Sequence, residues 1–155
     1  MRILLVGAGG VGGAVTAIAA RREFVERLVV ADYDPARSEK AVAALIRAQR
    51  ITHVFNAVDP RFVMPIFDAA QRTGVDYLDM AMSLSHPHPE RPYAETGVML
   101  GAEQFAQARA WEAAGRLALV GIGVEPGLSD VFARYAADHL FTEIEEIGIR
   151  DGAKS

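Results

Sequence analysis

The stretch "ILLVGAGGVGGAV", residues 3–15, decides how the chain folds. A short run of branched apolar residues is typical of a buried strand, and a glycine-rich turn and a run of small residues follow it. Gly7, Gly9 and Gly12 have the G-x-G-x-x-G spacing of a dinucleotide-binding turn. The first glycine allows a tight turn, the second lets backbone approach a pyrophosphate, and the third lets the helix pack close to the strand. The stretch therefore predicts a phosphate site at a helix N-terminus.

Strand-like and helix-like segments alternate along the rest of the chain. Strands are predicted at residues 2–9, 27–34, 52–60, 75–81, 117–127 and 143–152, and helices at 12–23, 35–50, 62–74, 102–116 and 128–141. This alternation predicts an α/β fold, a Rossmann-type doubly wound parallel sheet with the start of a second α/β domain. We place the dinucleotide-binding Rossmann domain at residues 1–127. Residues 128–155 would be an interdomain helix and the first strand of a truncated substrate domain.

Composition narrows the classes of function. The chain has 155 residues, is 51% hydrophobic, carries a net charge of −4 and contains no cysteine. Disulfides and thiolate chemistry are therefore excluded, and the lack of a basic stripe argues against nucleic acid as a partner. Residues 3–20 are uncharged, but their glycines would weaken a membrane helix, so we expect a cytoplasmic protein without a membrane partner. Lys40 and Lys154 offer no good candidate for a buried catalytic lysine.

The second predicted strand ends in Asp32, 20 residues after Gly12, where a carboxylate can accept hydrogen bonds from the adenosine ribose. Such a carboxylate repels a 2′-phosphate, so NAD is favoured, while Arg37 keeps NADP open. The alternative is a glycine turn used only for packing, with Asp32 as a helix cap. Asp59 either contacts the cofactor or caps the next helix. The predicted cofactor-binding residues are Gly7, Ala8, Gly9, Gly10, Val11, Gly12, Asp32, Asn56, Ala57 and Val58.

Two further motifs are not general features of Rossmann folds: "GVDYLD", residues 74–79, and "GVEPGL", residues 123–128. Together with "VGAGGVG", "ADYD" and "NAVDP", they resemble the saccharopine dehydrogenase-like family, also called the saccharopine reductase or lysine dehydrogenase group. The resemblance extends over nearly the whole chain. It implies an N-terminal Rossmann domain, a second α/β domain that covers the substrate, and reversible oxidation of an amine on an amino acid. The hydride would pass to a nicotinamide cofactor through an imine.

The resemblance also implies roles for single positions. Tyr77 and Asp79 match a Y-x-D motif whose acid faces the cleft near the nicotinamide. Gly123, Pro126 and Gly127 match the turn that closes the pocket.

The sequence departs from the family pattern twice. Family members usually have another helix and strand between the ribose acid and the "NAV" strand, whereas residues 34–52 offer one helix. Either the chain lacks this unit or the sequence omits it. The chain also ends where the second domain of the family has barely begun.

Asp79 is the first candidate for a catalytic group. A carboxylate there could hold the substrate ammonium, or act as a base if burial raises its pKa; the alternative is a buried turn acid satisfied by backbone N–H groups. Glu125 either contacts the substrate or accepts turn amides. His86 and His88 lie in a proline-rich loop and lack the further ligands of a metal site, so no metal is expected; the loop is either a plain surface loop or a lid that contacts the substrate. The predicted substrate-cleft residues are Tyr77, Met80, Glu125, Pro126 and Gly127.

The sequence therefore favours an NAD(P)-dependent oxidoreductase acting on the C–N bond of an amino acid or its imine. A nucleotide-sensing Rossmann module without catalysis, and a reductase of another C=N or C=C bond, remain as alternatives. The expected partner is a small-molecule substrate, and the exposed segment 143–149 leaves a homodimer open.

Overall fold

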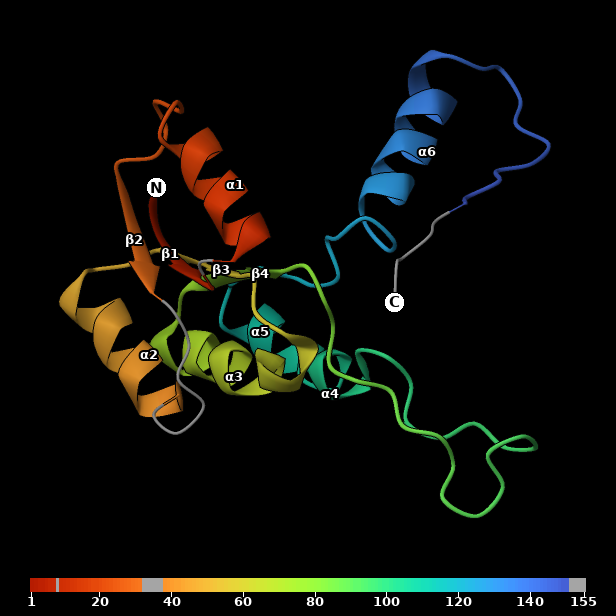
Figure 1. Ribbon diagram of the computed structural model, residues 1–155, viewed down its shortest axis with the longest axis horizontal. Coiled ribbons are helices and arrows are strands. Elements are labelled where there is room, and N and C mark those ends of the chain that lie inside the picture. Colours follow the sequence, from red (N-terminus) through yellow and green to blue (C-terminus); the bar gives the residue numbers. More distant parts are fainter. Residues whose placement is uncertain (8, 32–37, 151–155) are drawn as a thin grey trace.

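A parallel sheet forms the centre of the molecule in the computed structural model, which describes residues 1–7, 9–31 and 38–150 (Figure 1). In this part of the chain the strands follow the order β2-β1-β3-β4-β5, and all neighbours are parallel. Their bounds are β1 Arg2–Val6, β2 Arg27–Ala31, β3 His53–Asn56, β4 Asp76–Asp79 and β5 Ala118–Leu119. The predicted α/β, Rossmann-type fold is confirmed.

Helices cover the two faces of the sheet unequally. Helix α1, Gly10–Ala19, lies on one side, and α2, Ser38–Ala48, and α3, Val63–Thr73, lie on the other (Figure 1). The short helices α4, Ala102–Phe105, and α5, Ala108–Ala113, join α3 on that second side. The main core fills the space between these helices and the sheet, and includes Leu4, Val6, Val54, Ile66, Phe67, Tyr77 and Trp111.

Local signals set most element ends. Helix α3 ends at Gly74, which adopts φ 68° and closes the helix with backbone bonds, as predicted. The helix predicted at 102–116 is divided into α4 and α5, and Gly115 follows with φ 61°. The strand predicted at 117–127 contains only two paired residues.

The strand predicted at 143–152 is wrong for its described residues, 143–150, which form no regular element. A strand needs backbone partners on a neighbouring strand, and the alternation of apolar residues alone does not supply them. Helix α6, Leu128–His139, stands apart from the sheet and has no buried residue (Figure 1).

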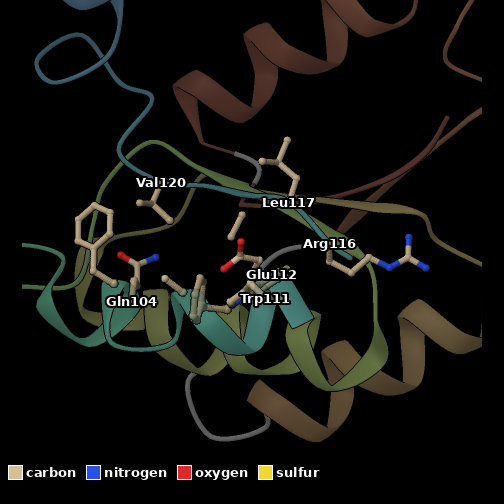
Figure 2. A pocket seen from close by; sticks show the side chains of 10 residues that line it. Gln104, Trp111, Glu112, Arg116, Leu117 and Val120 are labelled. Atoms are coloured by element: carbon tan, nitrogen blue, oxygen red, sulfur yellow. The ribbon is translucent and has the colours of Figure 1, made fainter. Parts of the chain in front are cut away.

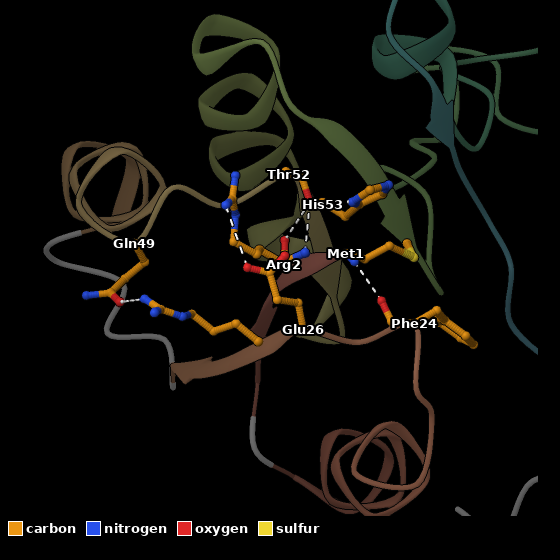
Figure 3. A network of polar contacts seen from close by, with 8 residues as sticks. Met1, Arg2, Phe24, Glu26, Gln49, Thr52 and His53 are labelled. Carbon is orange, nitrogen blue, oxygen red and sulfur yellow. Dashed lines mark hydrogen bonds and ion pairs between the residues drawn. The ribbon is translucent and has the colours of Figure 1, made fainter.

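A polar network ties together the first residues of the central strands (Figure 3). The amide of Arg2 donates to Thr52 Oγ1 at 2.9 Å, and the Thr52 hydroxyl donates to the Arg2 carbonyl at 3.0 Å. Thr52 Oγ1 lies 2.8 Å from His53 Nδ1. These bonds fix the register of β1 against β3 at the edge opposite the carboxyl ends of the strands.

None of the helices in residues 1–7, 9–31 and 38–150 has both the length and the apolar character of a membrane span.

Candidate functional site

The carboxyl ends of three strands bring the predicted site segments side by side. Val6 pairs with Asn56, and Asn56 pairs with Asp79. The glycine turn after β1, the turn after β3 and the segment after β4 therefore leave the sheet at one edge. Ligands of open α/β sheets bind at this edge.

The glycine turn is closely packed at two positions and open at two. Gly7 has φ +100°, and a Cβ added there would lie 2.7 Å from the Ala57 carbonyl oxygen. A Cβ at Gly12 would lie 1.9 Å from the Gly7 carbonyl oxygen. In contrast, a Cβ at Gly9 or Gly10 would meet nothing within 4 Å. Positions 7 and 12 need glycine for packing, and positions 9 and 10 leave bare backbone accessible.

Helix α1 begins at this bare backbone without a side-chain cap. Gly9 is the N-cap residue, and the first turn contains no acidic residue. The first N–H groups of a helix have no acceptor within the helix, and they carry partial positive charge. Val11, which is 47% exposed, leaves the helix start open to solvent. These features fit the phosphates of a dinucleotide.

The turn after β3 contacts the glycine turn directly. The amide of Ala57 donates to the Val6 carbonyl at 2.9 Å, and Asn56 Oδ1 accepts from the amide of Val58 at 3.3 Å. Asn56 is 2% exposed, so its amide shapes the turn from inside. Asp59 is exposed and accepts from the amide of Arg61 at 3.0 Å, which is the capping alternative. The side-chain hydrogen bond from Arg61 lowers the pKa of Asp59.

Asp79 lies in the interior at the end of β4, and its side chain is 0% exposed. Oδ2 accepts from the Tyr77 hydroxyl at 2.9 Å and from Gln104 Nε2 at 2.7 Å, and Oδ1 accepts from the amide of Gly121 at 2.7 Å. Burial raises the pKa of Asp79, and the bonds from Gly121, Gln104 and Tyr77 oppose that rise. The carboxylate does not face an open cleft, so its catalytic role stays a prediction.

Tyr77 also points inward, and its role as a substrate-cleft residue stays a prediction. It is 2% exposed, and its ring packs edge-on against Phe67 with centroids 5.1 Å apart. Its hydroxyl accepts from Asn56 Nδ2 at 2.9 Å. Burial, followed by the charge of Asp79, raises the pKa of Tyr77 well above its ordinary value. Met80, the next predicted cleft residue, is partly buried, and a Cβ added at Gly123 would lie 2.7 Å from its carbonyl oxygen.

The segment 121–127 forms a closed turn beside this network. The amide of Gly123 donates to the Pro126 carbonyl at 2.9 Å, and Gly127 has φ +130°. A Cβ at Gly127 would lie 2.6 Å from the Gly123 backbone, so the turn requires glycine there. Glu125 is exposed and accepts a hydrogen bond from the Ser129 hydroxyl.

Sequence reasoning missed Gln104. This residue is 2% exposed, donates to Asp79, and accepts from the amide of Ser83 at 2.9 Å. It lines a hollow of about 340 Å³ between α4, α5 and β5, together with Trp111 (Figure 2). The available signal was its spacing, since residues seven apart share a helix face and Trp111 is a core residue.

Some predicted residues lie outside the described part of the chain: Ala8, Asp32 and Arg37. His86 pairs through its backbone with Val98, and His88 Nε2 lies 3.1 Å from a Glu95 carboxylate oxygen. Within the described residues, no group of three or more histidines and acids could hold a metal ion.

Comparisons with known proteins identify proteins that are similar to this chain. Residues 3–64 match the family model described as "Saccharopine dehydrogenase NADP binding domain". Carboxynorspermidine synthase of Vibrio alginolyticus is 29% identical over 183 residues, and carboxyaminopropylagmatine dehydrogenase of Synechocystis sp. is 29% identical over 171. Each alignment covers 97% of this chain, which spans only 43% and 41% of the two relatives.

Both alignments are longer than the 155 residues of the chain, so these relatives contain residues that it lacks within the aligned part. The described residues place a single helix, α2, between β2 and β3.

A solved structure gives the same fold. Apo saccharopine dehydrogenase (L-Glu forming) of Saccharomyces cerevisiae superposes with a TM-score of 0.62 and 16% identity, covering 90% of this chain and 31% of that one. The family model and the curated relatives thus confirm the resemblance found in the sequence: this chain is similar to saccharopine dehydrogenase-like proteins, and residues 3–64 match the cofactor-binding domain of that family.

Proposed function

We propose that this chain supplies the cofactor half of an NAD(P)-dependent oxidoreductase that acts on the C–N bond of an amino acid or its imine. The observation that carries the proposal is the glycine turn. It combines the close contact of Gly12 with Gly7, bare backbone at Gly9 and Gly10, and an uncapped helix start.

The chain's own residues would bind and orient the dinucleotide. The turn at residues 7–12 and the N–H groups of α1 would hold the phosphates, and residues 56–58 would lie beside the cofactor. The cofactor would supply or accept the hydride. Reduction of an imine adds a hydride to carbon and a proton to nitrogen, so a proton donor is also needed. Met80, Glu125, Pro126 and Gly127 remain the proposed substrate-side residues.

The substrate class is inferred from the relatives. The names of the two relatives describe amines that carry a carboxyl group. A carboxylated amine would combine the amino-acid character expected from the sequence with a C–N bond to be formed or broken. We therefore place carboxylated amines first among the substrates to be tested.

The remaining parts of the proposal concern organisation. Residues 1–127 would be the dinucleotide-binding domain, and 128–155 would begin the substrate domain. The protein would act in the cytoplasm, as a homodimer if the exposed apolar surfaces pair with a second copy.

Calorimetric titration of the purified chain with NADH and, separately, with NADPH tests the proposal. Preference for NADH by at least about tenfold, roughly 1.4 kcal/mol, is expected if Asp32 binds the ribose. Preference for NADPH would agree with the description of the matched family and move the assignment to Arg37. Binding of neither would contradict the proposal.

A turnover assay separates an enzyme from a sensor. The full protein with a carboxylated amine should change the absorbance of the nicotinamide cofactor between its oxidised and reduced forms. Binding without turnover on any carboxylated amine or imine would favour the nucleotide-sensing alternative.

A further inference from the structure

A continuous chain of buried side chains runs beneath the candidate site. Asn56 Nδ2 donates to the Tyr77 hydroxyl at 2.9 Å, which donates to Asp79 Oδ2 at 2.9 Å. Gln104 and the amide of Gly121 complete the bonding of the carboxylate. All four of these side chains are at most 2% exposed, so solvent does not compete for the bonds.

This hydrogen-bonded network of side chains joins three segments that are far apart in the sequence. Through Tyr77 and Asn56 it reaches the turn 56–58, whose Ala57 carbonyl oxygen would lie 2.7 Å from a Cβ added at Gly7. Through Gln104 it reaches the amide of Ser83, where the long connection after β4 begins.

The third segment, residues 121–127, is hydrogen-bonded to Asp79 at two points. The side chain of Asp79 accepts from the amide of Gly121, and its backbone carbonyl accepts from the amide of Ile122 at 2.9 Å. Asp79 is therefore the common point of the turn 56–58, the start of segment 83–101 and the loop 121–127.

We propose that Asp79 is a positioning residue: its buried carboxylate fixes these three segments relative to one another, and does not exchange a proton with the substrate. The inference rests on the proposed function, because the segments it fixes are those assigned to cofactor and substrate. A proton acceptor must come within hydrogen-bond reach of the reacting group. Asp79 is 0% exposed, and both of its oxygens are already bonded.

A buried carboxylate is a costly way to fill space. An apolar side chain of similar volume often stabilises a fold at least as well, whereas a carboxylate bonded by several donors specifies one arrangement. Here the donors come from β4, α4 and the loop after β5. Asp79 therefore holds these elements in one relative arrangement.

The test compares the two acids of β4. Asp79→Asn and Asp76→Asn make the same chemical change on one strand. The Asp76 carboxylate accepts from the amide of Leu117 at 3.0 Å and lies 3.5 Å from His53 Nε2, at the opposite edge of the sheet. Binding of NADH and NADPH is measured by calorimetry, and thermal stability is measured in parallel. We expect Asp79→Asn to weaken binding about tenfold or more, and Asp76→Asn to change it less than about twofold.

A second variant tests the link itself and remains informative if Asp79→Asn does not fold. Tyr77→Phe keeps the ring in its aromatic contacts and removes only the hydroxyl between Asn56 and Asp79. It should weaken nucleotide binding about threefold or more, while Tyr135→Phe on the exposed helix α6 should not.

Steady-state kinetics of the full protein separate the two roles of Asp79. If Asp79 is a positioning residue, its substitution should raise the KM for the nucleotide by a larger factor than any factor by which kcat falls. Loss of a proton acceptor predicts a fall in kcat of about a hundredfold or more with nucleotide binding unchanged, and that result would overturn the inference. Equal effects of Asp79→Asn and Asp76→Asn on binding would also overturn it. Failure of the unmutated chain to bind either nucleotide would instead count against the proposed function.

Discussion

The two faces of the sheet are built from alternate residues of the same strands, yet only one face is covered by several helices. On the side of α3, Leu4 is 0% exposed and Val54 1%. On the side of α1, Phe55 is partly exposed, Leu119 is 40% exposed, and a hollow of about 290 Å³ remains. An apolar strand pattern thus sets which side chains share a face, while the packing of helices determines which of those side chains become core.

Leu4→Ala on the covered face should produce the largest change. Leu4 is fully buried in the main core, so its truncation leaves a cavity that the surrounding helices cannot fill completely. We expect the free energy of unfolding to fall by about 2–5 kcal/mol, measured by urea denaturation. A loss below about 1 kcal/mol would mean that the covered face is loosely packed, and would remove the contrast between the faces.

Gly12→Ala tests α1, the helix that the described residues place on the less covered face. The added methyl would meet the Gly7 carbonyl, so α1 must shift away from the glycine turn. We expect a loss of stability of about 1–3 kcal/mol, with nucleotide binding reduced at least tenfold in calorimetry.

Gly13→Ala is the matched control for this variant, because a Cβ there meets nothing within 4 Å. It should leave binding unchanged and stabilise α1 by up to about 1 kcal/mol. Similar loss of binding in both variants would contradict the close-packing argument.

How much the sequence could predict depended on how local the signal was. The glycine spacing predicted the β1–α1 turn, and Gly74 predicted the end of α3, because each depends on one or two backbone conformations. Segment 143–150 could not be assigned correctly from alternation, since pairing depends on a neighbouring strand.

The features of the candidate site also differed in how far the sequence could predict them. The bare backbone of the glycine turn could be predicted, and a buried Asp79 was one of two alternatives, whereas the inward orientation of Tyr77 could not be predicted. Residues two apart on a strand point to the same face, so the two had to share a side, but which side became buried depended on α3, α4 and α5. Gln104 comes from a distant segment, and its bond to Asp79 is a tertiary contact.

The contribution of Asp79, on the covered face, to the free energy of unfolding should depend on pH, and this effect should be smaller than those above. Burial raises the pKa of Asp79 above its ordinary value of 3.8, so the folded protein binds this proton more tightly than the unfolded chain does. The free energy of unfolding of the unmutated chain, minus that of Asp79→Asn, should therefore increase as the pH falls from neutrality towards 3.8. Urea denaturation at several pH values measures this difference. A difference that decreases on acidification would show that the hydrogen bonds outweigh burial.

Leu119→Ala should have the smallest effect and tests the open face directly. The change is chemically identical to Leu4→Ala, but Leu119 is 40% exposed on a strand at the edge of the sheet, so little apolar area is lost from the interior. We expect the free energy of unfolding to fall by less than about 1 kcal/mol. A loss close to that of Leu4→Ala would mean that this face is covered in solution. A second copy of the chain would cover this face only at protein concentrations above the dissociation constant of the dimer, so the loss of stability would then depend on protein concentration. Light scattering would show a dimer that Leu119→Ala weakens.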